Sequence, residues 1–428
     1  MNALIKSAKI IDSNSKFNGK TVDILIEKGI ISKIGSNLKN LNNIKEISFN
    51  DLNVSAGWFD MRTNFCDPGH EYKEDLNSGL KAAAKGGFTG VMVMPDSNPS
   101  TSTKGGIEYL INKTKGNIVD ALPAGSLSHN CEGKEIAEMY DMHTAGAIAF
   151  TDNKKSVSKS SLLNRALLYS QSFSGLIINF PNDKELSNSG QINEGVVSTE
   201  LGLKGIPALA EELMVSRDIF LAEYCNSKIH LSNITTRKSV QLIKEAKKKG
   251  LNITADVNSY HLLLDETELL HFDNHYKVNP PLRTKEDIKA LITGLKDGTI
   301  DVICSDHTPE DIENKQCEFD HAAFGMINLQ TSFSVANTAI NGKLDLTEAI
   351  SKITSSPRKI LGLENVGIKE GEKANLTLFS PTEKWSLQKE DIVSKSKNTP
   401  LIGRELTGKV YGVVNNNLIN LENEIIEK

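Results

Sequence analysis

Residues 299–306 read TIDVICSD, a short apolar run that ends in polar residues. Five earlier stretches have the same texture and precede polar or helical segments: GVMVMP at 90–95, AGAIAFTD at 145–152, SGLIINF at 174–180, KIHLSN at 228–233 and LNITADV at 251–257. Strands that alternate with helices build parallel sheets from βα units. Because no GxGxxG phosphate turn follows any of these runs, the pattern predicts an α/β fold with a (β/α)₈ barrel rather than a doubly wound sheet.

The two ends of the chain have a different texture. Apolar and polar residues alternate in LIKSAKIID at 4–12, VDILIEKGIISKIG at 22–35, ANLTLFSP at 374–381 and GKVYGVVNNNLI at 408–419. This alternation is typical of half-buried antiparallel strands. We therefore predict that residues 1–56 and 368–428 together form a small β-sandwich domain, and that residues 57–367 form the barrel.

Composition excludes several classes of protein. The 428 residues carry 49 Lys and Arg against 54 Asp and Glu, so the net charge of −5 is mild. The sequence has no basic stretch with interleaved aromatic residues, and nucleic-acid binding is therefore not expected. No window of about 18 apolar residues occurs, so a membrane-spanning helix is not expected. The first residues also lack the pattern of a signal peptide. Five scattered cysteines without CxxC spacing argue against a disulfide framework. We expect a cytoplasmic protein.

In a barrel of this kind the chemistry takes place at the carboxyl ends of the strands. The residues that close the apolar runs are therefore the first candidates for a functional site. They are Arg62, Asn64, Asp96, Asp152, Phe180, Asn233 and Asp306.

Four stretches in the same order resemble the dihydroorotases, a branch of the amidohydrolase superfamily. They are GWFDMRTNFCDPGHEYKEDLNSGLKAAAKGGFTGVMVMPDSNPS at 57–100, NEG at 193–195, SNITTRKSVQLIKEAKKKG at 232–250 and KVNPPLRTKEDIKALITGLKDGTIDVICSDHTPE at 277–310. The resemblance covers essentially the whole chain. It implies a distorted TIM barrel with a composite β-sandwich, a link to pyrimidine biosynthesis, and a zinc centre that makes a water nucleophilic at neutral pH.

The zinc ligands that the resemblance implies are largely missing here. The family's Asp-x-His-x-His after the first strand reads Asp60-Met61-Arg62-Thr63-Asn64, and its two later histidines correspond to Phe180 and Asn233. Asp152 matches the aspartate ligand, and Asp306 matches the residue that acts as ligand and general base. Two carboxylates without imidazoles do not hold Zn²⁺ usefully. We therefore predict no metal, and Asp306 as a vestigial general base.

The substrate contacts that the resemblance implies are altered too. Cys66 stands where the family has an arginine, Asp96 where it has an asparagine and Glu310 where it has a histidine, while Asn279 in VNPPLR is retained. One cation is lost and two carboxylates are gained. A substrate that carries a carboxylate would be repelled by such a pocket.

Arg62 supports a sharper hypothesis. Without a dication, the carboxylates of the pocket would be buried and unpaired, which is costly. A guanidinium offers a permanent charge and a planar fork that suits carboxylates. We predict that Arg62 takes the place of the metal and pairs with Asp306 or Asp152.

Three other histidines offer alternatives. His230 lies three residues before Asn233, where strand alternation predicts the opposite face and a packed or hydrogen-bonded side chain rather than a ligand. His271 and His275 have the i,i+4 spacing of a helical metal site, but their Asp- and Asn-rich surroundings favour a solvated loop.

The sequence leaves three functions open. The favoured interpretation is a dihydroorotase-like protein without metal or activity, which is a structural or regulatory partner of aspartate carbamoyltransferase and, by the resemblance, a homo-oligomer such as a dimer. The first alternative is an active dihydroorotase or another cyclic-amide hydrolase, of the hydantoinase or allantoinase kind, with an atypical centre or with Cys66 as nucleophile. The second alternative is a small-molecule binding protein that kept the pocket and lost the reaction.

Overall fold

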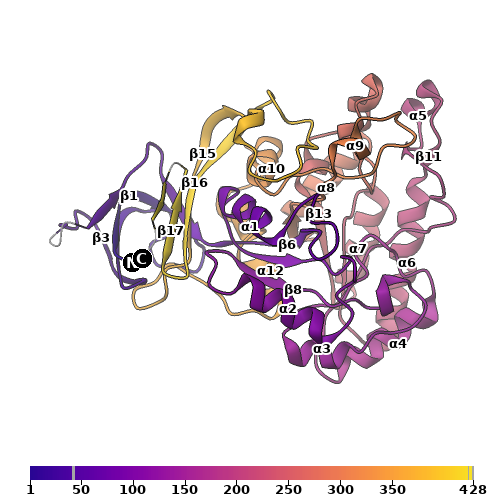
Figure 1. The fold of residues 1–428 in the computed structure, drawn as a ribbon, viewed down its shortest axis with the longest axis horizontal. Coiled ribbons are helices and arrows are strands. Elements are labelled where there is room, and N and C mark those ends of the chain that lie inside the picture. The colour runs from indigo at the N-terminus through magenta and orange to yellow at the C-terminus, as the bar shows by residue number, and fades with distance from the viewer. Residues whose placement is uncertain (41–43, 423, 427–428) are drawn as a thin grey trace.

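The computed structural model describes residues 1–40, 44–422 and 424–426 of the chain. It has two parts, a β-sheet in which the two chain ends meet and a larger part in which helices surround parallel strands (Figure 1). The predicted fold class, a barrel combined with a β-domain from both termini, is confirmed.

Seven parallel strands form the wall of the barrel in two groups. The first group pairs in the order β6-β7-β8 and the second in the order β14-β13-β12-β9. Their bounds are β6 Trp58–Thr63, β7 Phe88–Val93, β8 Asp120–Pro123, β9 Ile177–Asn179, β12 Ile229–Leu231, β13 Ile253–Asn258 and β14 Val302–Cys304. Every residue of β6 and β7 is buried, as expected for strands that are covered on both faces.

Single parallel bridges join the two groups into a ring. Thr63, at the end of β6, bridges to His307 after β14. On the other side, Phe150 bridges both to Gly125 and to Ile177 of β9. The apolar run at 145–152 therefore occupies the place of an eighth strand but makes only these isolated bridges instead of the full strand that the sequence predicts.

Helices follow most of the strands and cover the barrel. They are α1 Leu76–Lys85, α2 Lys104–Thr114, α3 Met139–Ala145, α4 Ser160–Gln171, α5 Val196–Leu201, α6 Ala208–Cys225, α7 Arg237–Lys248, α8 Lys285–Lys296, α9 Ile312–Lys315, α10 Ser332–Ile340, α11 Leu346–Ser351 and α12 Ser355–Leu361. Side-chain caps set several starts: Asp75, Thr236 and Thr284 each accept a hydrogen bond from a backbone amide in the first turn. The short pair β10 Ile192–Asn193 and β11 Gly205–Ile206 lies before α6.

The two chain ends build one continuous sheet of nine strands. Its main path is β18-β17-β16-β15-β5-β1-β2-β3, and β4 pairs with β1. The bounds are β1 Ala3–Ile10, β2 Thr21–Glu27, β3 Ile30–Gly35, β4 Lys45–Ile47, β5 Asn53–Ala56, β15 Leu376–Ser386, β16 Glu405–Asn415, β17 Leu418–Leu421 and β18 Glu424–Ile426. Residues 41–43, 423 and 427–428 of the predicted domain lie outside the described residues, and the boundaries at 56/57 and 367/368 stay predictions.

The two ends meet directly. β5 pairs antiparallel with β15, and one apolar core draws on strands from both termini. The amino group of Met1 donates a hydrogen bond to Asn417 Oδ1 at 2.6 Å. Figure 1 shows the N- and C-terminal ends next to each other on this sheet.

An aromatic cluster joins the sheet to the barrel. Trp58 begins β6 and is fully buried, with its ring centroid 4.6 Å from that of Phe333 in α10 and 5.3 Å from that of Phe379 in β15. Its indole Nε1 donates to Ser55 Oγ at 2.8 Å. Large aromatic side chains contribute heavily to core energetics, so this cluster fixes the start of the first barrel strand against the sheet.

Candidate functional site

A buried ion pair lies at the carboxyl ends of the barrel strands. The guanidinium of Arg62, on β6, places Nη2 3.1 Å from Asp256 Oδ2 on β13. His230, on β12, places Nε2 2.9 Å from the same oxygen and Nδ1 2.8 Å from Thr254 Oγ1. The backbone amide of Asn233 donates to Asp256 Oδ1 at 2.7 Å. Asp256 is therefore held by a cation, an imidazole and a backbone amide.

Burial and charge oppose each other at this pair. Burial disfavours the charge on Arg62, but the nearby negative charges, Asp256 foremost, outweigh burial and raise the pKa of Arg62. No hydrogen-bond partner for its Nε lies among the described residues. The predicted inward position of Arg62 is confirmed, since it is only 2% exposed. The predicted partner is wrong: it is Asp256 rather than Asp306 or Asp152.

Asp306 has a cation of its own. Lys154 Nζ lies 2.8 Å from Asp306 Oδ2, and Asn258 Nδ2 donates to the same oxygen at 3.2 Å. The hydroxyl of Tyr260 also donates to it. Lys154 therefore compensates the charge of Asp306, while Arg62 pairs with Asp256. Asp306 is 2% exposed, so this group is closed off from solvent.

A chain of amides continues from Arg62 toward the surface. Arg62 Nη1 donates to Asn153 Oδ1 at 3.3 Å, and Asn153 Nδ2 donates to both carboxylate oxygens of Asp96 at 3.0 Å. Asn64 Nδ2 donates to Asp96 Oδ1 at 3.3 Å. Three predicted site residues, Arg62, Asn64 and Asp96, thus belong to one network, which Asn153 connects.

Two further carboxylates, those of Asp152 and Asp60, accept hydrogen bonds that join separate backbone segments. Asp152 Oδ1 accepts from the amides of Leu127 and Ser128 at 3.0 and 2.9 Å, and the Ser128 hydroxyl donates to Oδ2. Asp60 accepts from the amide and hydroxyl of Ser305, both at 2.7 Å, and so ties β6 to the segment after β14. Burial raises the pKa of both carboxyls. Asp60 Oδ2 also accepts from the backbone amide of Arg62 at 3.4 Å, but the guanidinium of Arg62 pairs with Asp256 instead of Asp60 or Asp152.

The other predicted residues lie at separate points around the network. Asn233 donates to Asn258 Oδ1 at 3.1 Å, Phe180 is buried after β9, and Asn279 is half-buried. Glu310 Oε2 lies 2.7 Å from Lys73 Nζ, so its charge is compensated. Burial, followed by the charge of Asp96, raises the pKa of the Cys66 thiol far above its ordinary range. The roles of these residues in binding stay predictions.

The donor set does not fit the zinc centre that the resemblance implies. At the four expected histidine positions stand a guanidinium engaged with Asp256, an amide engaged with Asp96, a phenyl ring and an amide engaged with Asn258. Asp152 and Asp306 already have their own donors. Over the described ranges, no group of three His, Cys, Asp or Glu side chains could hold a metal ion.

The remaining histidines do not assemble into a second site. His271 ends the 3₁₀ helix Glu266–His271, while His275 lies in the next one, Asn274–Tyr276, and pairs through Nδ1 with Asp273 at 2.7 Å. The segment is accessible to solvent, as the sequence predicts, and its backbone forms short 3₁₀ turns. His230 is buried and hydrogen-bonded, as predicted, and its partner Asp256 places it in the same network as Arg62.

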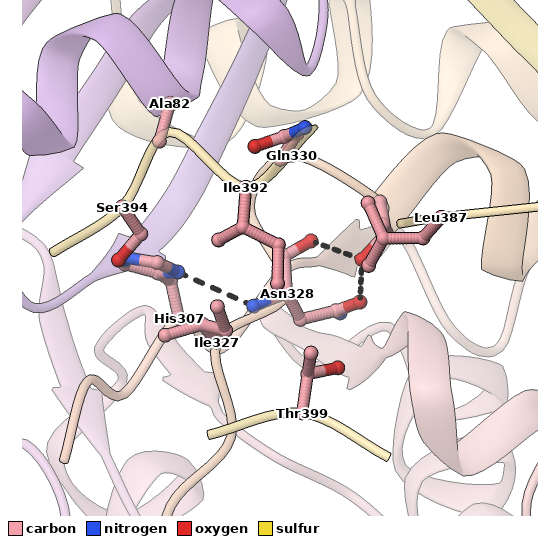
Figure 2. A pocket seen from close by; sticks show the side chains of 10 residues that line it. Ala82, His307, Ile327, Asn328, Gln330, Leu387, Ile392, Ser394 and Thr399 are labelled. Atoms are coloured by element: carbon pink, nitrogen blue, oxygen red, sulfur yellow. Dashed lines mark hydrogen bonds between the residues drawn. The ribbon is translucent and has the colours of Figure 1, made fainter. Parts of the chain in front are cut away.

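A small cavity lies beside His307, in the segment that follows β14. It is lined by His307, Asn328, Ser394 and seven further residues (Figure 2). His307 Nδ1 accepts a hydrogen bond from the backbone amide of Asn328 at 3.2 Å, and its Nε2 faces Glu74 at 3.5 Å. The volume, about 10 Å³, is close to that of a single water probe. This cavity is too small for an organic substrate.

Sequence reasoning missed Asp256 and Lys154. Asp256 belongs to the run ITADVN, in which Thr254, Asp256 and Asn258 share one face of β13 by strand alternation. The period-two spacing of these polar residues was the available signal. Lys154 follows Asp152 by two residues in a segment without regular structure, so no periodicity predicts its direction.

The barrel, its polar strand ends and the attached sheet define the class of protein by fold. The structure resembles the L-hydantoinase (dihydropyrimidinase) from Arthrobacter aurescens with a TM-score of 0.82 and 19% sequence identity, over 100% of this chain and 96% of that chain. A D-hydantoinase structure matches with a TM-score of 0.81 and 21% identity, over 100% and 95% of the two chains. At these identities the likeness shows the fold.

Sequence comparison then gives the family. Residues 54–239 match the family described as dihydro-orotase-like. A protein named dihydroorotase from Acetivibrio thermocellus is 39% identical over 99% of this chain and 100% of its own length, and one from Caldicellulosiruptor saccharolyticus is 42% identical over 97% of both chains. The chain belongs to the dihydroorotase family.

Among the helices of residues 1–40, 44–422 and 424–426, none combines the length and the hydrophobicity that a membrane-spanning helix needs.

Asp256 is expected to make stability fall at low pH. Burial alone would raise its pKa, but the charge of Arg62 and the hydrogen bond from His230 outweigh burial and hold the pKa at about 2, below the ordinary 3.8. A pKa that is lowered in the folded state stabilises the fold above the unfolded value, and this stabilisation is lost as the pH falls from 3.8 to about 2.

The measurement is urea unfolding of the wild type and of Asp256→Asn at several pH values. The difference between their free energies of unfolding is expected to shrink by roughly 2 kcal/mol over that range, because the other carboxyls cancel in the comparison. A difference that stays constant between pH 4 and pH 2 would contradict the assignment of a stabilising charge to Asp256.

Proposed function

We propose that this chain is a member of the dihydroorotase family that is linked to pyrimidine biosynthesis, carries no metal and does not catalyse the reaction. The position of Arg62 carries the proposal. Its guanidinium lies among the strand ends, 3.1 Å from Asp256, at the place where the family resemblance implies an imidazole ligand. A guanidinium stays protonated in proteins and repels a metal cation.

The state of Asp306 supports the same proposal. A general base must be within hydrogen-bond reach of the proton that it abstracts. Asp306 Oδ2 instead accepts from Lys154, Asn258 and Tyr260, and the residue is almost fully buried. Arg62 and Lys154 together supply two positive charges beside Asp256 and Asp306. We infer that these two cations replace the charge of a dication and so keep the barrel folded without one.

The proposed role is that of a structural or regulatory partner of aspartate carbamoyltransferase in the cytoplasm. Support comes from the contrast between the overall fold and the residues at the positions of the metal ligands. The fold keeps a TM-score of 0.82 to a solved hydantoinase over the whole chain, while the residues at the ligand positions are chemically different. A protein that keeps the fold while the residues at the ligand positions are replaced suits a binding role better than a catalytic one.

The alternative is an active dihydroorotase, or another cyclic-amide hydrolase of the hydantoinase or allantoinase kind, with an atypical centre. Full-length identities of 39% and 42% to proteins named dihydroorotase favour it. Without a metal, general-base catalysis would accelerate the reaction only about 10²–10⁴-fold. Cys66 is a poor nucleophile here because its raised pKa keeps it as the thiol.

Metal content and turnover, measured on one preparation, separate the two functions. The full chain is purified without chelator, its zinc is quantified by mass spectrometry, and dihydroorotase activity is assayed with and without added Zn²⁺. We expect no bound zinc and no turnover, with the Acetivibrio thermocellus protein as the matched positive control. Near-stoichiometric zinc together with turnover would establish the active alternative instead.

The partnership needs its own measurement. The chain is mixed with aspartate carbamoyltransferase from the same organism, and the mixture is analysed by size-exclusion chromatography and by carbamoyltransferase assay. We expect the two proteins to elute together. Separate elution with unchanged carbamoyltransferase activity would refute the partner role and leave the absence of dihydroorotase activity as an independent question.

A further inference from the structure

A cavity of about 420 Å³ lies between three segments that are far apart in the chain, and we name it the lysine cavity. Tyr72 comes from the segment after β6, Glu310 and Ile312 come from the segment around α9, and Lys389 and Lys397 come from the segment between β15 and β16. Small-molecule sites usually have volumes of roughly 300–1,000 Å³. Within the described residues, Glu310 is the one predicted site residue in its lining, so the cavity lies outside the buried network at the strand ends.

Four lysines give the wall of the lysine cavity a positive charge. They are Lys315, Lys389, Lys395 and Lys397. Lys395 pairs with Asp75. Over residues 1–40, 44–422 and 424–426, the other three lysines form no ion pair with a carboxylate, and the hydrogen bonds of Lys315 and Lys397 go to backbone carbonyls. Three cations therefore line the cavity without a counter-charge of their own.

Two carboxylates also line the cavity, but they do not balance these lysines. Glu310 Oε2 lies 2.7 Å from Lys73 Nζ, so its charge is already compensated. Asp311 accepts a hydrogen bond from the backbone amide of Asn314 at 2.8 Å at the start of α9 and forms no ion pair in the described part of the chain. Three unpaired lysines against one unpaired aspartate leave an excess of two positive charges at the cavity wall.

Two of the unpaired lysines are partly or fully withdrawn from water. Lys315 is 3% exposed and donates to backbone carbonyls, the nearest at 2.9 Å. Lys397 is half-buried and donates to the carbonyls of Ile392 and Ser394 at 2.6 and 2.8 Å, which leaves one of its three N–H groups without a partner among the described residues. Burial lowers the pKa of Lys315 to about 8 and lowers that of Lys397 as well. Carbonyls hold an ammonium group but do not neutralise it, so an anion in the cavity would offset the cost of these buried charges.

Large apolar side chains line the same cavity and are open to solvent. Tyr72 is 62% exposed, Ile312 is 63% exposed and Ile402 is 41% exposed. Ligand sites combine mainly apolar walls with a few charged or polar groups that fix the orientation of the ligand. A tyrosine ring next to cations therefore suits an organic anion that has a flat apolar part.

We propose that the lysine cavity binds a phosphate monoester that carries a flat ring and has about the size of a nucleoside monophosphate. The type of cation favours phosphate over carboxylate. The described lining contains lysines and no arginine, and a lysine ammonium binds phosphate as a point charge, whereas the planar fork of arginine suits carboxylates. A phosphate monoester carries a charge of roughly −1.5 to −2 at pH 7, which matches the excess of two positive charges. This site goes beyond the proposed function and does not depend on whether the chain catalyses a reaction.

Isothermal titration calorimetry of the full chain tests the ligand class. The probes are adenosine monophosphate and uridine monophosphate, which carry a large and a small ring, and the controls are adenosine, uridine and inorganic phosphate. We expect at least one of the two nucleotides to bind with a Kd below about 1 mM, and its nucleoside and inorganic phosphate to bind at least about ten-fold more weakly. The proposal would be overturned if neither nucleotide bound, or if inorganic phosphate or the nucleoside bound as tightly as the nucleotide.

Two pairs of variants test whether the nucleotide binds in this cavity. Lys389→Ala removes an exposed cation from the wall and is expected to weaken binding about ten-fold. Its matched control is Lys248→Ala, because Lys248 is also exposed but lies at the end of α7 and does not line the cavity. Tyr72→Ala is likewise expected to weaken binding about ten-fold, since the flat ring of the ligand loses its aromatic contact, whereas Tyr72→Phe keeps the ring and is expected to bind as the wild type does.

Circular dichroism checks that each variant is folded, which is expected because Lys389, Lys248 and Tyr72 are all exposed. Wild-type affinity in both Lys389→Ala and Tyr72→Ala would place the nucleotide elsewhere and overturn the assignment of this cavity. An equal loss in Lys248→Ala would reduce the effect of Lys389 to the overall charge of the protein and would overturn the assignment as well.

Discussion

Arg62→Met is expected to lower the free energy of unfolding by about 3–5 kcal/mol. The substitution keeps an unbranched side chain in the barrel but leaves Asp256 as a buried carboxylate without its cation. His230 and the Asn233 amide would remain as its donors, and neither supplies a permanent charge. The measurement is urea unfolding at neutral pH followed by far-UV circular dichroism.

The double variant Arg62→Met/Asp256→Asn is the matched control. It removes both charges, so it is expected to lose clearly less stability than the sum of the two single losses. Additive losses, or a single-variant loss below about 1 kcal/mol, would show that the guanidinium does not compensate Asp256. The pair would then be a neighbouring contact and not the replacement of a metal charge.

Trp58→Ala is expected to lower the free energy of unfolding by about 3–5 kcal/mol. Trp58 is fully buried between Phe333 and Phe379, so its removal leaves a cavity where the first barrel strand meets the sheet. The indole hydrogen bond to Ser55 is lost as well. Urea unfolding by circular dichroism measures the loss without relying on tryptophan fluorescence.

Trp58→Phe is the control for this cluster. It keeps an aromatic ring between the same neighbours and loses only the remaining volume and the hydrogen bond, so it is expected to cost clearly less than Trp58→Ala. If the two variants were equally stable, or Trp58→Ala cost less than about 1 kcal/mol, the aromatic cluster would not be what couples the barrel to the sheet.

The fold could be predicted because its signals are local. Runs such as TIDVICSD, with β14 at Val302–Cys304, and the alternating ends of the chain each mark one element by their own periodicity. The run at 145–152 is the exception: its apolar composition predicts a strand, but only Phe150 makes bridges, to Gly125 and Ile177, and these partners lie outside the run. That information is not present in the segment itself.

The candidate site was predictable in position but not in pairing. Strand ends identify which residues converge, so Arg62 was placed correctly inside the barrel. Which carboxylate Arg62 pairs with depends on distances across the barrel, which strand register sets. It also depends on Lys154, which comes from an irregular segment and pairs with Asp306. The prediction that Asp152 could pair with Arg62 likewise overlooked that Ser128 and the Leu127 amide already satisfy its carboxylate.

The sheet built from both chain ends has a consequence for how the protein is made. β5 can align with β1 early in synthesis, but its other neighbour, β15, is more than 300 residues away in the chain. During translation, the edge of the N-terminal strands stays open until nearly the whole polypeptide has left the ribosome. Such long-range closure slows folding and exposes a hydrogen-bonding edge to other nascent chains. Until β15 pairs with it, β5 therefore keeps one edge open to pairing with another nascent chain.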